Sequence, residues 1–128
     1  MCTAISNCSS ACSAADRLFA AGDLVDRGPY SPQVLDWLAK PWFASVRGNH
    51  EQLVIDIVLA GDDRDLHLRN GGAWLYKLTP LTRERIARRL QQLPLAIEVE
   101  LGDGRRAGIV HAEVPITPAF PDWDSRVA

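Results

Sequence analysis

Two stretches decide the fold of this chain: residues 20–31, AAGDLVDRGPYS, and residues 45–52, SVRGNHEQ. Each begins at the end of a short apolar run and changes, at a glycine, into a cluster of charged and polar residues. This pattern is typical of a buried parallel strand that ends in a ligand-binding loop. The two stretches therefore predict neighbouring strands whose polar ends meet at one edge of a sheet.

The residues around these stretches predict helices between and after the strands. The apolar runs are residues 18–21 and 42–46, and an amphipathic segment follows each of them. Ser31 is a favourable N-cap, Pro32 suits the first helical position, and Gly61 is placed to end the second helix. The order strand, helix, strand, helix with short connections predicts an α/β fold built on a parallel βαβ unit.

The second half of the chain predicts further helix and a hairpin. Residues 62–72, DDRDLHLRNGG, have the composition of a loop, and AWLYKL after them predicts a helical turn. Residues 81–94 predict a helix with Thr82 as its N-cap and a proline at its end. Residues 95–110 alternate between apolar and polar side chains on both sides of an Asp-Gly pair, which predicts an antiparallel hairpin.

Length, charge and cysteine content bound the class of protein. A chain of 128 residues predicts one domain, in which residues 1–15 are unstructured or unrelated and residues 16–128 carry the fold. The net charge of -2 argues against nucleic acid or a membrane surface as a partner. No apolar run approaches the roughly 18 residues of a membrane span, and three clustered cysteines favour a reducing, cytoplasmic location.

The polar residues at the predicted strand ends have the chemistry of a phosphate-processing metal site. Asp23, Asn49 and His111 offer oxygen and imidazole donors without thiolates, which suits manganese, iron or zinc. Arg27 and Arg47 offer forked donors for an oxyanion such as phosphate.

His50, with the Asp26 carboxylate nearby, has the composition of a general acid and the group that orients it. Simpler interpretations stay open for each residue alone. Asp23 can cap a turn, Asn49 can cap a helix, and His111 can be a satisfied histidine at a strand end. Asp26 and Arg27 can form a solvated loop pair. His67 is expected to be solvated in a charged loop, and a solvated helix face is expected for Arg83, Arg85, Arg88 and Arg89.

Three segments in order carry a family resemblance: GDLVDRG at residues 22–28, RGNHE at 47–51 and HAEVP at 111–115. Together they resemble the phosphoprotein phosphatase family of metallophosphoesterases, and most closely its small bacterial and phage serine/threonine protein phosphatases. The match runs from about Asp16 to Trp123. It implies a two-sheet sandwich flanked by helices, in which two metal ions share a bridging hydroxide that attacks phosphorus in line.

The resemblance implies that Asp23 bridges two divalent metal ions and that Asn49 and His111 bind the second. Manganese is the expected metal, with iron or zinc as alternatives. The Gly-Asp-x-His-Gly motif that begins the family is absent here, as is a later histidine in a Gly-His-Thr context. The resemblance therefore implies a domain incomplete at both ends, with at most one weakly held metal ion and turnover far below that of a complete member.

The resemblance further implies that His50, oriented by Asp26, protonates the leaving alcohol and that Arg27 and Arg47 hold the phosphoryl oxygens. The expected substrate is a phosphoprotein or phosphopeptide. The acidic residues retained in the first two motifs, Asp26 and Glu51, favour a protein phosphatase over a diadenosine tetraphosphate hydrolase, which is the alternative enzyme. An inactive fragment of a phosphatase is the alternative outside catalysis.

Overall fold

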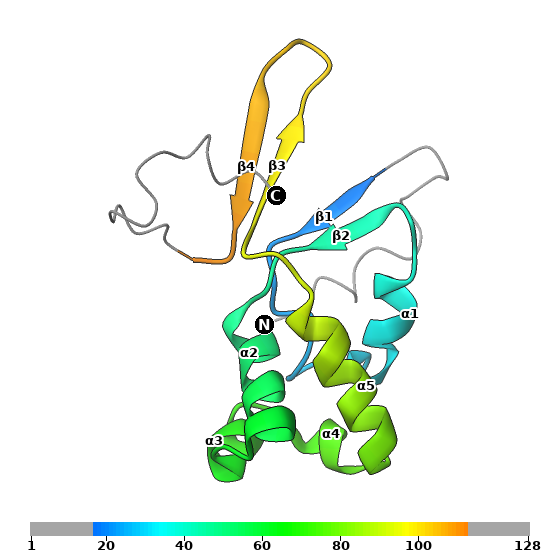
Figure 1. The fold of residues 1–128 in the computed structure, drawn as a ribbon, viewed down its shortest axis with the longest axis vertical. Coiled ribbons are helices and arrows are strands. Elements are labelled where there is room, and N and C mark those ends of the chain that lie inside the picture. The colour runs from blue at the N-terminus through cyan, green and yellow to red at the C-terminus, as the bar shows by residue number, and fades with distance from the viewer. Residues whose placement is uncertain (1–16, 113–128) are drawn as a thin grey trace.

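The computed structural model describes residues 17–112, so the predicted unstructured or unrelated segment 1–15 lies outside the described residues. The described chain combines helices with two small two-stranded sheets and is of the α/β class (Figure 1). Its strands are β1 (Leu18–Ala20), β2 (Phe43–Ser45), β3 (Ala96–Glu100) and β4 (Arg106–Val110), and its α-helices are α1 (Val34–Leu38), α2 (Asn49–Ile55), α3 (Arg64–Arg69), α4 (Ala73–Tyr76) and α5 (Pro80–Gln91).

The first sheet is the predicted parallel pair. β1 lies beside β2 in a register that places Leu18 opposite Phe43 and Ala20 opposite Ser45. The backbone N–H of Val46 also donates to the carbonyl of Ala20 at 3.2 Å, so the two strands end side by side. This confirms the βαβ prediction and brings the two polar loops to one edge of the sheet.

The two helices of the βαβ unit form where the sequence predicts them. Ser31 is not a simple N-cap but the first residue of a 3-10 turn, Ser31–Gln33, that leads into α1. α2 continues into a π-helical turn, Asp56–Ala60. Gly61 ends it with a φ of 70°, as expected for a glycine after a helix.

The loop prediction for residues 62–72 is wrong, because residues 64–69 form α3. Asp63 caps this helix, and its side chain accepts from the backbone N–H groups of Asp65 and Leu66 at 3.0 and 3.1 Å. A single N-cap carboxylate thus offsets the loop-like composition of a short charged segment. The helical turn predicted for AWLYKL is confirmed as α4.

α5 begins earlier than predicted, and its arginines are less solvated than predicted. Thr79, rather than Thr82, is the N-cap, and its hydroxyl accepts from the N–H of Thr82 at 3.3 Å. Pro80 then takes the first helical position, where no N–H is needed. Arg83 donates to three backbone carbonyls that precede the helix, and Arg89 donates to the carbonyl of Leu38 at 3.2 Å.

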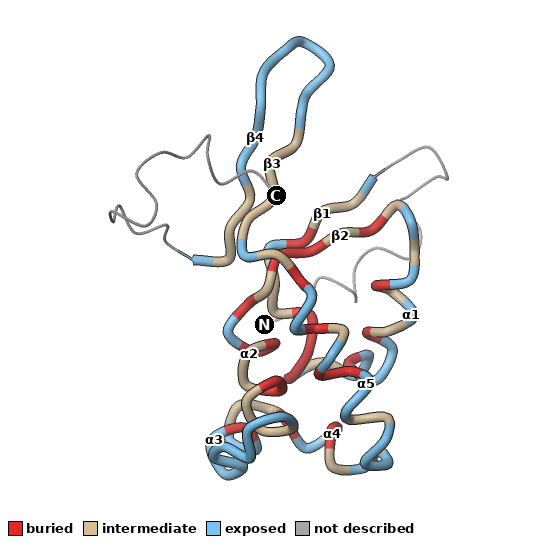
Figure 2. Tube along the Cα trace, in the orientation of Figure 1, coloured by how far each residue is buried: buried red, intermediate tan, exposed pale blue. Residues whose placement is uncertain are grey.

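The second sheet is the predicted hairpin, with Ala96 opposite Val110 and Glu100 opposite Arg106. It extends away from the helices, with residues 100–108 exposed and the strand residues nearer its base partly buried (Figures 1 and 2). Its base contacts the rest of the fold at the strand ends. There the carbonyl of Pro94 accepts from Arg47 N–H at 2.8 Å, and His111 Nδ1 lies 2.7 Å from the carbonyl oxygen of Ala21.

The hydrophobic core lies between the parallel strands and helices α1, α2 and α5, with contributions from the loop after β1 and from α4 (Figure 2). Leu24 and Val25 of that loop are fully or almost fully buried, so the loop is anchored into the core by apolar side chains. Among the described residues, no helix has the length and apolar character required to cross a lipid bilayer.

Candidate active site

The two polar loops cross in contact with each other because each has a glycine at the crossing point. A Cβ atom on Gly22, whose φ is 88°, would lie 2.8 Å from the backbone N and Cα of Gly48. A Cβ atom on Gly48 would in turn lie 2.6 Å from the backbone nitrogen of Asp23. Only hydrogen fits on both sides, so these glycines allow the strand ends to approach closely enough to build a shared site.

Glu51 is fully buried and accepts hydrogen bonds from the backbone of both loops. Its Oε2 atom accepts from the backbone N–H groups of Gly48 and Asp23 at 2.7 and 2.8 Å. Its Oε1 atom accepts from those of Leu24 and Val25 at 2.6 and 3.3 Å. Burial raises the pKa of the Glu51 carboxyl, and these backbone donors oppose that rise.

This anchoring holds a backbone that is otherwise unfavourable. Asp23, Asp26 and Arg27 have φ values of 55°, 70° and 59°, in the left-handed region that non-glycine residues rarely adopt. Each such residue costs on the order of 1 kcal/mol or more, and such strain is found where surrounding contacts over-determine a functional loop. The buried Glu51 supplies those contacts at the start of the loop.

Asp23, Asn49 and His111 converge at the crossing, and we call these residues the ligand cluster. His111 Nε2 lies 2.7 Å from Asn49 Oδ1 and 3.4 Å from Asp23 Oδ1. The side chains of His111 and Asp23 are 24% and 15% exposed, so solvent reaches the cluster. Among the described residues, no three His, Cys, Asp or Glu side chains are grouped so that they could hold a metal ion, and the third polar group of this cluster is the Asn49 amide.

The hydrogen bonding of the ligand cluster fits a bound cation. His111 Nδ1 is 2.7 Å from the carbonyl oxygen of Ala21, which requires a proton on Nδ1. A neutral imidazole then presents Nε2 as an acceptor, and it faces two further acceptors, the oxygens of Asn49 and Asp23. A divalent cation held by these three atoms would satisfy them, and the Nδ1–carbonyl bond is the usual support of a metal-binding histidine.

Asp26, His50 and His67 form a second group beside the first, which we call the acid cluster. Asp26 Oδ2 lies 2.9 Å from His50 Nδ1, and both side chains are buried. The backbone N–H of His50 donates to Asp23 Oδ1 at 3.4 Å, which joins the two clusters. The interpretation of Asp26 as a solvated loop residue is therefore wrong: it is 2% exposed.

The prediction that His67 is solvated is also wrong, because this side chain is fully buried against Asp26. His67 Nε2 lies 2.9 Å from Asp26 Oδ1, and Trp74 Nε1–H donates to the same oxygen at 2.7 Å. Burial by itself would raise the pKa of Asp26, but the hydrogen bonds from His67, Trp74 and His50 outweigh it and hold the pKa below its ordinary value of 3.8.

The two candidate phosphate ligands lie in different settings. Arg27 is exposed, and its Nη2 donates to Asn70 Oδ1 at 3.1 Å, which orients the guanidinium at the edge of the site. Arg47 Nη2 instead donates to the carbonyls of Gln91, the last residue of α5, and Leu93 at 2.6 and 3.2 Å. The structure thus holds Arg47 against the end of a helix.

Most of the residues named from the sequence come together, whereas several of their partners could not be named. Asp23, Asp26, Asn49, His50 and His111 share one strand-end region. The partners that sequence reasoning missed are Asn70 and Trp74, and His67 was assigned to solvent. The sequence signal for these partners is the pair of consecutive glycines in NGGAW. This signal is weak because consecutive glycines are also common in ordinary loops.

The chain is similar in sequence to known proteins. A family model described as calcineurin-like phosphoesterase matches residues 6–124. The chain is 36% identical over 103 residues to Serine/threonine-protein phosphatase 2 of Escherichia coli, covering 78% of this chain and 46% of that protein. It is also 36% identical over 115 residues to Serine/threonine-protein phosphatase 1 of Salmonella typhimurium, covering 88% of this chain and 51% of that protein.

The chain thus spans about half the length of the relatives it matches. The match includes both polar loops and the histidine at the end of β4. Because the family model covers most of the sequence, the chain belongs to the calcineurin-like phosphoesterase family.

Proposed function

We propose that this chain is a metal-dependent phosphomonoester hydrolase of the serine/threonine protein phosphatase type. The observation that carries the proposal is the meeting of the two clusters. Three ligand atoms converge on one point, and the buried His50–Asp26 pair begins one residue away along α2. Relatives named serine/threonine-protein phosphatase support the reaction type.

Asp23, Asn49 and His111 are the proposed ligands of a divalent cation. Manganese is our choice, since the set is made of oxygen and imidazole donors without thiolate. When bound, such a cation supplies Lewis acidity toward phosphoryl oxygens and helps water act as a nucleophile. The two-sheet sandwich of the family belongs to this proposal, with the β1–β2 and β3–β4 pairs as parts of its sheets.

His50 and Asp26 are proposed to supply the proton. As the bond from phosphorus to the leaving oxygen breaks and a bond to the water oxygen forms, doubly protonated His50 gives its Nε2 proton to the departing alkoxide. The attacking water releases a proton, so that alcohol and phosphate are produced. Asp26 holds the Nδ1–H of His50, which leaves Nε2 as the nitrogen that meets the substrate. His50 is only 6% exposed, so a substrate would reach it through a small opening.

Arg27 and Arg47 are proposed to bind the phosphoryl group. Arg27 is supported by its exposure and by its orientation through Asn70. Arg47 would have to exchange its contacts with the end of α5 for the phosphoryl oxygens. The proposed substrate is a phosphoprotein or phosphopeptide, and the bidentate forks of the arginines match its phosphate.

The test measures hydrolysis of para-nitrophenyl phosphate and of a phosphoserine peptide with excess Mn²⁺. We expect manganese-dependent turnover that disappears in His50→Asn, while the matched exposed variant Asp103→Asn at the hairpin turn keeps the wild-type rate. Turnover equal to background in all three proteins would assign the chain to the inactive fragments. Preference for diadenosine tetraphosphate over both phosphomonoesters would favour the dinucleotide hydrolase.

A further inference from the structure

Helix α3 buries a histidine and exposes its leucines. His67 is 0% exposed, whereas its neighbours Leu66 and Leu68 are 41% and 39% exposed. Within α3, His67 is the only buried residue. Leucine is ordinarily buried more readily than histidine, so burial of apolar surface does not explain how this helix is oriented. The contacts of the histidine explain it.

The two ring nitrogens of His67 have different partners, and together they define its protonation. Nδ1 lies 3.2 Å from the hydroxyl of Tyr76, and Nε2 lies 2.9 Å from Asp26 Oδ1. A carboxylate accepts only, so Nε2 carries a proton, and in the neutral ring Nδ1 accepts from the Tyr76 O–H. His67 and Trp74 thus both donate to Oδ1 of Asp26, which leaves Oδ2 for His50 Nδ1 at 2.9 Å.

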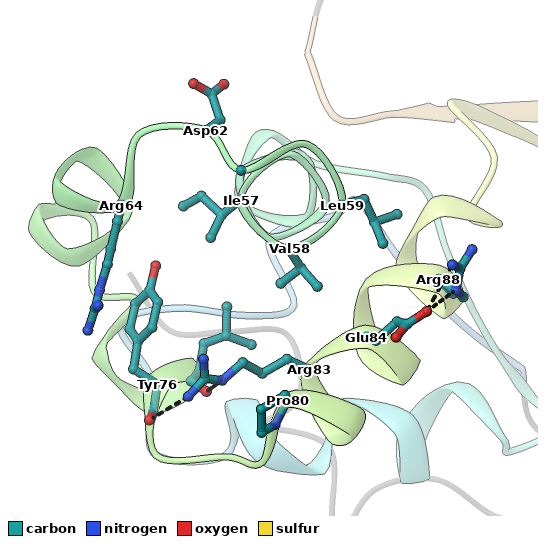
Figure 3. A pocket seen from close by; sticks show the side chains of 12 residues that line it. Ile57, Val58, Leu59, Asp62, Arg64, Tyr76, Pro80, Arg83, Glu84 and Arg88 are labelled. Atoms are coloured by element: carbon teal, nitrogen blue, oxygen red, sulfur yellow. Dashed lines mark hydrogen bonds and ion pairs between the residues drawn. The ribbon is translucent and has the colours of Figure 1, made fainter.

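Tyr76 is itself held in place, as Figure 3 shows from the side of a surface pocket that it lines. The guanidinium carbon of Arg64 lies 4.3 Å from the centre of the Tyr76 ring. Arg83 Nη2 donates to the Tyr76 carbonyl at 2.9 Å.

Gly72 also lies against His67. A Cβ atom on Gly72 would collide with the imidazole ring, so glycine at this position leaves space for the ring.

We propose that His67 is a positioning residue for the acid: it fixes the rotation of the Asp26 carboxylate so that Oδ2 holds the Nδ1–H form of His50. The inference rests on the proposed function, since it assigns His50 as the acid. His67 touches His50 only through Asp26 and is therefore not itself catalytic. Supporting residues of this kind hold a catalytic group within about 0.5 Å of its productive position.

The experiment records the imidazole ¹⁵N resonances of the full chain, without metal, in wild type and in two variants. His67→Gln keeps an amide N–H for Asp26 and an oxygen for Tyr76, whereas His67→Phe keeps the ring shape and loses both hydrogen bonds. We expect His50 to be in the Nδ1–H form in wild type and in His67→Gln. In His67→Phe we expect a mixture with the Nε2–H form, and kcat about tenfold lower with KM changed less than twofold.

Two further variants keep the test decisive. Tyr76→Phe removes only the hydroxyl, and we expect it to shift the His67 resonances and to reduce the Nδ1–H fraction of His50. Gly102→Ala, whose added methyl group meets no atom within 4 Å, is the matched control and should leave every resonance of His50 unchanged. An unchanged His50 spectrum in every folded variant overturns the proposal. Absence of turnover in the wild-type chain overturns the proposed function instead, and the spectra still decide the role of His67.

Discussion

The ligand cluster and the acid cluster lie side by side, but they differ in how the described residues satisfy their polar atoms. In the acid cluster, the Asp26 carboxylate receives hydrogen bonds from His50, His67 and Trp74. In the ligand cluster, His111 Nε2 faces two oxygen acceptors and is partly exposed. Folding by itself therefore fixes the hydrogen bonds of the proposed proton donor, whereas a bound cation would satisfy the facing acceptors of the ligand cluster.

The largest effect is expected for Asp26→Asn, which changes the acid cluster and leaves the ligand cluster intact. An amide at this position donates to His50 Nδ1, which must then carry no proton, so it disfavours the doubly protonated ring from which Nε2 gives its proton. Because general acid catalysis contributes on the order of 10²–10⁴-fold, we expect turnover to fall by that factor or to background. The measurement is manganese-dependent hydrolysis of para-nitrophenyl phosphate.

The control for Asp26→Asn is Asp103→Asn, the same chemical change at an exposed turn. We also expect Asp26→Asn to retain the Mn²⁺ affinity of the wild type, since Asp26 is not a member of the ligand cluster. A loss of metal binding equal to the loss of turnover would show that the two clusters are not separable.

Glu51→Gln tests the support that both clusters share. Its carboxylate accepts four backbone N–H groups, and an amide nitrogen would face two of them as a donor. At about 1–3 kcal/mol for each unsatisfied buried donor, and with some relief from removing a buried charge, we expect a loss of about 2–4 kcal/mol in unfolding free energy. Urea denaturation measures it.

The control for Glu51→Gln is Glu84→Gln. Glu84 forms an exposed ion pair with Arg88 along α5, and such pairs contribute only about 0.3–0.5 kcal/mol. Equal stability changes in the two variants would contradict the view that Glu51 holds the loop crossing together.

His111→Ala tests the ligand cluster alone. Loss of even an outer partner of a metal site typically lowers affinity by about 10–100-fold, so removal of a ligand should lower Mn²⁺ affinity by at least that factor. Isothermal titration calorimetry measures the affinity, and Mn²⁺ should raise the melting temperature of the wild type more than that of the variant. The acid cluster should be unaffected, so the ¹⁵N spectrum of His50 should remain that of the wild type.

The pH dependence of stability gives a smaller effect with a defined sign. Because the pKa of Asp26 lies below its ordinary value of 3.8 in the folded protein, the unfolded chain takes up this proton first as the pH falls. The contribution of Asp26 to stability is therefore complete above pH 3.8 and is lost as the pH falls through the folded pKa. Unfolding free energies measured between pH 5 and pH 2 should therefore fall less steeply in Asp26→Asn than in the wild type.

The smallest expected effect is that of Arg47→Lys. It removes the forked contacts with the end of α5, so we expect a loss of about 1 kcal/mol in unfolding free energy. We also expect a few-fold weaker inhibition by orthovanadate, and a larger weakening in the matched variant Arg27→Lys. Unchanged inhibition with normal turnover would remove Arg47 from the phosphate site and leave it as a support of α5.

The parallel strand pair, the hairpin and the residues at the strand ends can all be predicted from the sequence. These follow from local patterns: an apolar run that ends at a glycine, and alternation on both sides of Asp103 and Gly104. Such patterns are readable because strand burial and turn geometry depend on neighbouring residues. The position of Asp23, Asn49 and His111 at the strand ends can be predicted for the same reason.

Which polar residues are buried, and what they contact, depends on the tertiary structure. His67 stands in a charged segment whose composition indicates solvent, yet it is buried because Asp26, 41 positions earlier, accepts its proton. Arg47 stands beside a predicted ligand, yet its guanidinium contacts carbonyls 44 and 46 positions later. Hydrogen bonds across such separations depend on how helices pack and not on local periodicity, so the sequence alone could not assign these partners.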